Sequence, residues 1–176
     1  MPLYTRTGDD GTTGTYGGGR VEKNSARMHA IGDIDELNAA IGVVQDVALL
    51  QLQSLLFDVG ADLATPDEND QIRRIDMDDI AFLESWIDTA DGQNDKLKVF
   101  ILPGGCAASA QLHLARTVCR RAERSVITLI QQNGCSSEIL IFINRLSDLL
   151  FALARLANKQ AGVEDIPWTP RAKEQS

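Results

Sequence analysis

The sequence predicts an all-α protein, a five-helix bundle preceded by an irregular, glycine-rich N-terminal loop. Of its 176 residues, 44% are hydrophobic but only 5% are aromatic, and leucine, alanine and isoleucine dominate, which favours helices over sheets. Apolar residues recur three and four positions apart in five segments, the spacing of a buried helix face. A chain of this length suits one domain. We place that domain at residues 1–166, followed by a polar tail at 167–176 whose start Trp168 can anchor.

Turn signals separate the five segments, since proline and glycine interrupt the apolar spacing at Pro66, Gly92 and Gly134. Residues 67–77 are acidic and indicate a loop, and the short apolar run at 99–102 indicates an extended, buried connector. Serine and aspartate can cap helix starts by accepting backbone N–H groups. The first expected helix starts between Ser25 and Asp33 and runs to about 44, and the second runs from about 49 to Thr65. The third runs from a cap at Asp78 to Asp91–Gly92. The fourth covers about 106–132, and the fifth covers about 138–161 with Ser136 or Ser137 as its cap.

The composition argues against several kinds of partner. The formal net charge is −8, which argues against nucleic acid and an anionic membrane surface. No run approaches the ~20 apolar residues of a membrane helix, and the N-terminus carries no basic-then-apolar leader. We therefore expect a soluble, cytoplasmic protein, and any anionic ligand is a small molecule held at a local site.

Cysteine and histidine show no metal-ligand spacing. Neither His29 nor His113 lies in a Glu-x-x-His pattern, which disfavours the di-iron type of helical bundle. Cys119 falls on the apolar side of its helix, and we interpret it as a buried thiol that packs as a small apolar residue.

Four of the seventeen basic residues fall within nine positions of the fourth helix. Helical phasing places Arg116, Arg120 and Glu123 beside the apolar face, whereas Arg121 projects almost opposite. Arginines at the edge of a core suit phosphate oxygens, because their forked donors can bind two oxygens at once. The alternative is a salt-bridged helix in which Glu123 pairs with its own arginines.

A narrow polar line crosses the otherwise apolar last helix, and Asn144, Asp148, Phe151 and Arg155 form it. Polar groups on a buried helix need partners. Those partners are either the arginines of the preceding helix or a ligand between the helices. Pairing of Asp148 with Arg145 or Arg155 would explain part of this line by structure alone.

The first helix carries Asp35 and Asn38 on one side, with apolar residues next to Asp35. A carboxylate beside the core favours a buried arginine partner, and loss of one member of such a pair costs about 3–5 kcal/mol. A bridge from Asp35 to Arg116 is therefore a candidate. A solvated charge is the ordinary alternative for Asp35.

The N-terminal loop from Thr5 to Thr13 combines hydroxyls, backbone amides and one arginine, the donors from which a polyphosphate cradle is built. Lys23 can add a point charge. The loop is not a Walker A motif, because no Gly-x-x-x-x-Gly-Lys-Ser/Thr string occurs in the chain. A flexible surface loop without a ligand is the competing interpretation.

Five strings in order, spread over about residues 3–158, give the chain a family resemblance. They are Tyr4–Thr13, Gly32–Asn38, Phe100–Gly105, Ala115–Arg124 and Asn144–Asp148. In these strings the chain resembles the PduO-type ATP:cob(I)alamin adenosyltransferases. The resemblance implies transfer of the 5′-deoxyadenosyl group of ATP to the cobalt of reduced cobalamin, with release of triphosphate. It also implies a homotrimer of five-helix bundles with active sites between neighbouring subunits.

The resemblance assigns site residues to two substrates, Mg-ATP and cobalamin. Phe100, Asp35, Arg116 and Arg120 would be the catalytic residues, and Phe100 would keep the lower axial base off cobalt. Asp35, Arg116, Phe100, Asp148 and Phe151 would bind cobalamin, and Glu123 is a candidate Mg²⁺ ligand. The residues that would bind ATP are Thr5, Arg6, Thr7, Gly8, Asp9, Asp10, Gly11, Thr12, Thr13, Lys23, Arg120, Arg121, Ala122, Glu123, Arg124 and Asn144.

Two other classes of protein remain open at this point. One is a non-catalytic carrier or regulator that binds ATP or adenosylcobalamin on the same scaffold. The other is a ligand-free helical oligomer, for which ATP would leave thermal stability unchanged. An enzyme of the family would also have protein partners, namely a reductase and an adenosylcobalamin-dependent enzyme.

Overall fold

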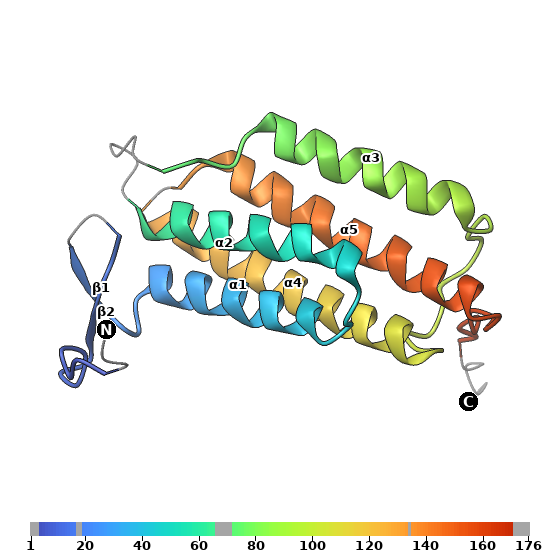
Figure 1. Ribbon diagram of the computed structural model, residues 1–176, viewed down its shortest axis with the longest axis horizontal. Coiled ribbons are helices and arrows are strands. Elements are labelled where there is room, and N and C mark those ends of the chain that lie inside the picture. The colour runs from blue at the N-terminus through green and yellow to red at the C-terminus, as the bar shows by residue number, and fades with distance from the viewer. Residues whose placement is uncertain (1–3, 17–18, 66–71, 134, 171–176) are drawn as a thin grey trace, which may run out of the picture.

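The computed structural model describes residues 4–16, 19–65, 72–133 and 135–170. Within them, five long helices lie side by side and a small hairpin stands at one end (Figure 1). This confirms the predicted five-helix bundle. The elements are β1 (Thr12–Gly14), β2 (Arg20–Glu22), α1 (Ala26–Gly42), the 3-10 turn η1 (Val47–Leu49), α2 (Leu50–Ala64), α3 (Met77–Gln93), α4 (Ala107–Asn133) and α5 (Ser137–Gln160).

Side-chain caps set the starts of three helices. Ser25 caps α1, at the beginning of the predicted range for its start, and Ser136, one of the two predicted candidates, caps α5. The predicted cap of α3 at Asp78 is wrong. Asp76 accepts from the backbone N–H groups of Asp78 and Asp79 at 2.9 and 3.2 Å, and Asp79 accepts in return from the N–H of Asp76. This reciprocal box fixes the start two residues earlier.

The N-terminal loop is more regular than predicted. β1 pairs with β2 in antiparallel register, with Thr13 opposite Val21. The connecting glycines at 17–18 lie outside the described residues. Threonine and valine suit a short strand pair, so Thr12–Gly14 and Arg20–Glu22 are paired strands rather than irregular backbone.

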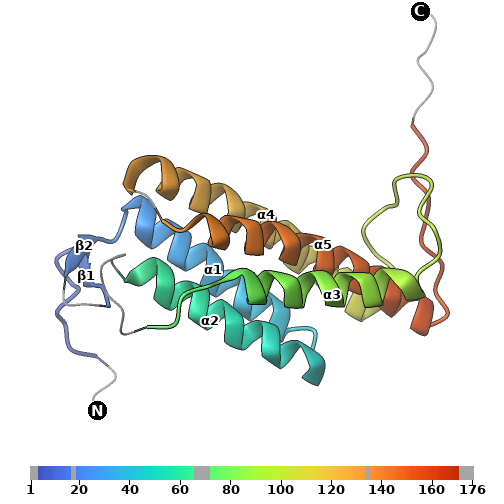
Figure 2. The same ribbon diagram turned by 90° about the horizontal axis from the view of Figure 1, so that it is seen from above.

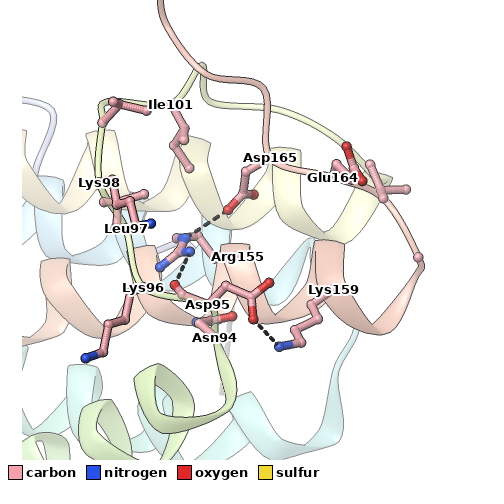
Figure 3. A pocket seen from close by; sticks show the side chains of 13 residues that line it. Asn94, Asp95, Lys96, Leu97, Lys98, Ile101, Arg155, Lys159, Glu164 and Asp165 are labelled. Atoms are coloured by element: carbon pink, nitrogen blue, oxygen red, sulfur yellow. Dashed lines mark hydrogen bonds and ion pairs between the residues drawn. The ribbon is translucent and has the colours of Figure 1, made fainter.

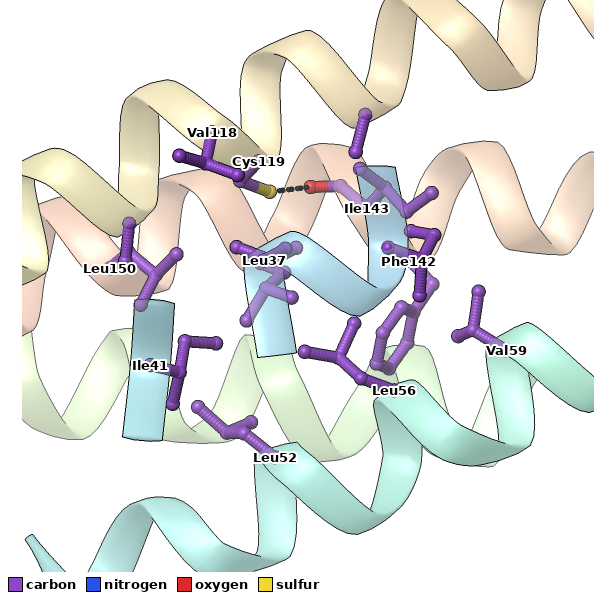
Figure 4. Packing of buried hydrophobic residues seen from close by; sticks show 14 of the residues in the cluster. Leu37, Ile41, Leu52, Leu56, Val59, Val118, Cys119, Phe142, Ile143 and Leu150 are labelled. Atoms are coloured by element: carbon purple, nitrogen blue, oxygen red, sulfur yellow. Dashed lines mark hydrogen bonds between the residues drawn. The ribbon is translucent and has the colours of Figure 1, made fainter. Parts of the chain in front are cut away.

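The core lies between α1, α4 and α5, with α2 and α3 closing it on the outer side. Its largest buried side chains include Phe142, Leu37 and Leu56, which interdigitate in Figure 4. Cys119 is fully buried and its Sγ donates to the Ile143 carbonyl at 3.3 Å. Burial raises the pKa of this thiol far above its usual value. The interpretation of Cys119 as a packing residue is therefore confirmed.

Residues 47–64 are long and apolar enough to cross a membrane by length and composition, contrary to the expectation that no segment approaches this. Soluble core helices pass the same test. The segment carries Asp58 and Asp62, which pair with Arg73 and Arg74. Its buried apolar side chains, among them Leu52, join the bundle core.

The connector at 99–102 is extended, as predicted, but it is not buried. Ile101 forms an antiparallel bridge with Pro167, and Phe100 is 78% exposed. The C-terminal segment hydrogen-bonds to backbone groups of this connector. The apolar side chains of the connector can therefore stay at the surface. The loop and this segment lie together at the end of the bundle opposite the hairpin (Figure 2).

Candidate active site

Five polar residues meet where α4 packs against α5, and we call them the α4–α5 cluster: Arg116, Arg120, Glu123, Asn144 and Asp148. Asn144 Nδ2 donates to Glu123 Oε1 at 3.1 Å, which joins the two helices. The four charged members all act on the buried Cys119 thiol between them. Burial is the main cause that raises the pKa of Cys119; Glu123 and Asp148 raise it further and the two arginines lower it.

The two arginines of this cluster are available to a ligand. Arg116 is half-buried; burial lowers its pKa and the nearby Arg120 lowers it further. The Nε of Arg116 is buried without a hydrogen-bond partner. Arg120 is exposed, and among the described residues neither arginine forms an ion pair. Two unneutralised guanidinium groups on one face provide an anion-binding surface.

The predicted internal partners of this cluster are otherwise engaged. Glu123 bonds to Asn144 rather than to an arginine of its own helix. The structural alternative, in which Asp148 pairs with Arg145 or Arg155, does not hold, because Arg145 binds Glu84 at 2.7 Å and Arg155 binds Asp165 at 2.8 Å.

Asn144 has a clear structural role at the cluster. Its amide donates to Glu123, and its Oδ1 accepts from Arg145 Nη1 at 3.1 Å. It therefore orients the Glu123 carboxylate, while Asp148 remains exposed. This leaves one fixed and one unengaged carboxylate beside the two arginines.

His113 extends this face toward the N-terminal end of α4, and sequence reasoning missed it. It is 3% exposed, and neither ring nitrogen has a hydrogen-bond partner. Its ring lies edge-on to Phe151 at 5.9 Å between centroids. Burial lowers the pKa of His113, and the charge of Arg116 lowers it further. The only feature of the sequence that could have placed His113 on this face is its position one helical turn before Arg116.

Arg121 lies on the other side of α4, toward α1. It binds Asp33 at 3.3 Å and also Glu36, and Ser125 donates to Asp33. Hydrogen bonding to Glu36 raises the pKa of Arg121. Arg124 instead donates to the Arg120 carbonyl at 2.7 Å, which holds it along the helix. The basic segment is thus divided between two faces, as its phasing predicts.

Asp35 lies on a different face from Arg116, so the predicted bridge does not form within the chain. Asp35 lines a pocket of about 440 Å³ between α1 and α2, next to Phe57 and Gly60. Two residues earlier, Asp33 reaches α4. A step of two residues turns a helix by about 200°, which directs Asp35 away from α4.

The N-terminal loop is held by its own polar contacts. Asp10 accepts from the N–H and hydroxyl of Thr12 at 2.9 and 2.8 Å, and these bonds lower the pKa of Asp10. Arg20 donates to the Thr12 hydroxyl and to the Thr7 carbonyl, and Lys23 Nζ donates to the Gly8 carbonyl at 2.7 Å. Arg20 was missed, because only the hairpin register brings it to Thr12.

Apart from Asp35 and Arg121, the predicted site residues lie in three separate places in one chain. The α4–α5 cluster is near the middle of α4, Phe100 is beyond its N-terminal end, and the N-terminal loop is at the opposite end of the bundle (Figure 1). Twenty-seven residues of α4 span about 40 Å at the rise of an α-helix. Phe100 and the N-terminal loop of one chain therefore cannot contact the same small ligand.

Among the described residues, no three histidine, cysteine or acidic side chains are grouped to hold a metal ion. A Mg²⁺ ion that keeps its waters and binds phosphate needs only one or two protein carboxylates. Glu123, held by Asn144 and lying beside the arginines, fits that requirement.

The fold and the cluster define a class: a helical-bundle protein with an arginine-lined face for an anionic ligand. The model of the cobalamin adenosyltransferase family matches residues 3–157. A cobalamin adenosyltransferase of Cupriavidus metallidurans is 44% identical over 175 residues, covering 94% of this chain and 93% of the relative. A corrinoid adenosyltransferase of Bacillus subtilis is 41% identical over 180 residues, covering 96% of this chain and 92% of the relative. The chain belongs to the cobalamin adenosyltransferase family.

Solved structures agree with this assignment. A variant PduO-type ATP:corrinoid adenosyltransferase from Lactobacillus reuteri, complexed with cobalamin and ATP, is 36% identical and superposes with a TM-score of 0.89. The superposition covers 96% of this chain and all of the other. A second variant from the same organism, complexed with ATP, gives a TM-score of 0.88 at 37% identity.

Proposed function

We infer that this protein transfers the 5′-deoxyadenosyl group of ATP to the cobalt of reduced cobalamin, giving adenosylcobalamin and triphosphate. The observation that carries this inference is the α4–α5 cluster, where Arg120 is exposed and no described acidic side chain neutralises its charge, on the helix that follows the exposed Phe100. Family membership supplies the reaction, and the cluster supplies a place for its anionic product.

The reaction needs little acid–base chemistry from the protein. The cobalt(I) electron pair attacks the ATP 5′-carbon, the carbon–oxygen bond breaks, and triphosphate leaves with that bond's electrons. The residues must hold the two substrates in line and stabilise charge on the leaving oxygens. Arginines and backbone amides suit that task.

ATP is held, in this proposal, by two groups of residues. Arg120, Arg124, Asn144 and Glu123 serve the phosphates from the helices. Arg121 and Ala122 belong to the same predicted set, but Arg121 is engaged by Asp33 and Glu36 on the other side of α4 and Ala122 is buried in the core. The second group is the N-terminal loop, residues Thr5–Thr13 with Lys23. Mg²⁺ accompanies the triphosphate, and Glu123 is its protein ligand.

Cobalamin lies against the N-terminal half of α4 in this proposal. The exposed Phe100 ring takes the lower face of the corrin and excludes the axial base, and Phe151 and Asp148 line the same side. An axial base donates electron density to cobalt, so its removal makes the step from cobalt(II) to cobalt(I) easier. Phe100 thereby acts in catalysis without any proton transfer.

The separation of the site residues supports assembly as a homotrimer with sites between subunits. Arg116 and Asp35 lie on different faces of one chain, so the bridge expected from the sequence would join two copies. The pocket beside Asp35, with its largely exposed Phe57, provides an apolar surface that a neighbouring subunit can contact. The N-terminal loop of one copy would then meet the α4–α5 cluster of the next.

In the cell we place the protein in the cytoplasm, with a reductase as its electron source and an adenosylcobalamin-dependent enzyme as the recipient of its product. A carrier that binds adenosylcobalamin without making it is the second candidate. Arg120, which stays unpaired in the proposed trimer, favours the enzyme, because a carrier of adenosylcobalamin does not stabilise triphosphate.

Anaerobic turnover tests the proposed function. Purified protein is mixed with cob(II)alamin, a strong reductant and Mg-ATP, and adenosylcobalamin formation is followed by absorbance. Multiple turnovers that depend on ATP support the enzyme. Tight binding of adenosylcobalamin without turnover would replace the enzyme with the carrier.

A further inference from the structure

Phe100 stands on a loop that has no regular structure of its own, so its placement depends on what holds that loop. Residues 94–106 connect α3 to α4 and include no helix or strand longer than a single bridge. The Phe100 side chain is largely exposed, and the described ring nearest it belongs to Trp168. The support therefore comes from the C-terminal segment.

Residues 163–168 run beside the Phe100 loop like a second strand. The Leu102 N–H donates to the Ile166 carbonyl and the Trp168 N–H donates to the Phe100 carbonyl, both at 2.8 Å. These bonds flank the bridge between Ile101 and Pro167. Proline has no N–H to donate, so the two flanking bonds fix the backbone of Phe100.

The C-terminal segment is itself fastened to buried polar groups of α5. Arg155, 7% exposed, donates to Asp165 and to the Asp95 carbonyl, both at 2.8 Å (Figure 3). Asn158, 2% exposed, donates to Asp165 at 3.1 Å and to the Gly104 carbonyl at 3.0 Å. One pair of buried side chains thus holds both the loop and the segment that supports it.

The two aromatic rings meet edge to face, with centroids 6.4 Å apart and planes at 75°. Such pairs have a preferred geometry, because the positive edge of one ring faces the negative face of the other. The indole therefore favours one orientation of a phenylalanine that is otherwise in solvent.

We propose that Trp168 is a positioning residue for the lower face of cobalamin, acting through Phe100. It holds the Phe100 ring in the orientation that excludes the axial base, and it does not touch ATP. This inference rests on the role of Phe100 proposed above.

The test compares Trp168→Ala and Trp168→Phe with the wild type in the turnover assay. An aromatic edge contact of this kind changes an equilibrium constant, here that between orientations of the Phe100 ring, by about three- to tenfold. We expect Trp168→Ala to lower kcat with cob(II)alamin by that factor and to leave the KM for ATP unchanged. Trp168→Phe should recover most of the loss, since phenylalanine restores an aromatic contact. Trp86→Phe, the same change at the other tryptophan, is the matched control and should keep full activity.

A spectroscopic measurement separates positioning from a general loss of structure. Electron paramagnetic resonance of bound cob(II)alamin with Mg-ATP reports the fraction from which the axial base has been removed. Trp168→Ala should lower that fraction, while circular dichroism and the Tm remain close to wild type. An unchanged fraction overturns the proposal.

A double variant distinguishes failure of this inference from failure of the Phe100 role. If Trp168 acts through Phe100, Trp168→Ala causes no further loss in a Phe100→Ala background. A further loss of the same size as in the wild type overturns the inference while Phe100 keeps its role. A Phe100→Ala variant with full activity removes Phe100 from the mechanism, and Trp168 with it.

Discussion

Arg120 and Arg121 are adjacent in the sequence but differ in what neutralises them. Arg121 binds Asp33 and Glu36 of α1, so much of its charge is engaged within the chain. Arg120 is exposed and lies close enough to Arg116 to lower the pKa of that residue. Two like charges held side by side are stabilised when an anion binds between them.

We expect Arg120→Ala to weaken ATP binding by at least about tenfold, since a charge-assisted hydrogen bond contributes roughly 1.5–3 kcal/mol. Isothermal titration calorimetry with Mg-ATP measures the effect. Lys96→Ala, which removes an exposed positive charge outside the cluster, is the control and should bind ATP normally. Normal affinity in Arg120→Ala would remove Arg120 from the ATP site.

His113 gives the fold a dependence on pH. Its pKa is lowered in the folded state by burial and by Arg116, whereas the unfolded chain has the usual value of about 6.5. Below that pH the unfolded state binds more protons, so stability falls as the pH drops. Above that pH the ring is neutral in both the folded and the unfolded state, so His113 adds no further pH dependence.

Thermal unfolding between pH 5.5 and 7.5 checks this dependence on His113. We expect His113→Phe to reduce the fall in Tm below pH 6.5, because phenylalanine takes no proton. His29→Gln changes the other histidine, which is exposed, and should leave the fall intact. The same slope in the wild type and His113→Phe would contradict the assignment.

At the scale of elements, Gly105 and Asn158 join the Phe100 loop to α5. Gly105 has a φ of +113°, and a Cβ there would lie 2.1 Å from Asn158 Oδ1. Asn158 also accepts from the Cys106 N–H at 2.9 Å, so it cannot move aside without losing that bond. The turn into α4 therefore requires glycine.

We expect Gly105→Ala to destabilise the protein by about 2 kcal/mol or more, since it combines backbone strain with a clash against a buried side chain. Denaturant unfolding gives the value. Gly104→Ala is the matched control, because a Cβ at Gly104 meets nothing within 4 Å. Equal stability of the two variants would show that the loop adjusts freely.

Periodicity predicted the long helices and the division of the basic segment between two faces, because a helix buries one side and the arginines keep their phase. It could not distinguish Asp76 from Asp78 as a cap, since both are aspartates near the same turn. It also treated the apolar run at 99–102 as buried. The run instead stays largely at the surface and pairs with residues 166–168, a contact between distant segments that no local pattern records.

The sequence proposes residues for the candidate site but not their arrangement. The strings of the family identified Arg116, Arg120 and Phe100 without reference to three dimensions. Which charges are already engaged became clear only from the contacts of Glu123, Arg145 and Arg155. The roles of His113 and Trp168 had no signal in the strings, because both act through neighbours that folding supplies.

At the scale of the whole molecule, Asp35 and Arg116 lie on different faces of the chain, which is the reason for our proposal that a complete site needs two copies. The proposed pair joins two copies, and removal of either charge leaves the other without a partner at an interface. Exchanging the two charges, with arginine at position 35 and aspartate at position 116, recreates the ion pair in the reverse order. Charge exchange therefore tests the assembly directly.

We expect Asp35→Arg and Arg116→Asp each to weaken the trimer by at least about tenfold, and the double variant to recover part of the loss. Light scattering after size exclusion measures the assembly, and turnover is measured on the same fractions. Asp88→Arg, a charge reversal on the exposed side of α3, is the control. A trimer in all the variants would refute the pairing.

The distance between the N-terminal loop and Phe100 has a consequence for mixed populations of chains. In the proposed trimer each chain lends its loop to one site and its Phe100 to another. A chain with a damaged loop and a chain with a damaged Phe100 are each inactive alone. When they assemble together, the intact loop of one meets the intact Phe100 of the other, and complementation between two inactive proteins restores a working centre.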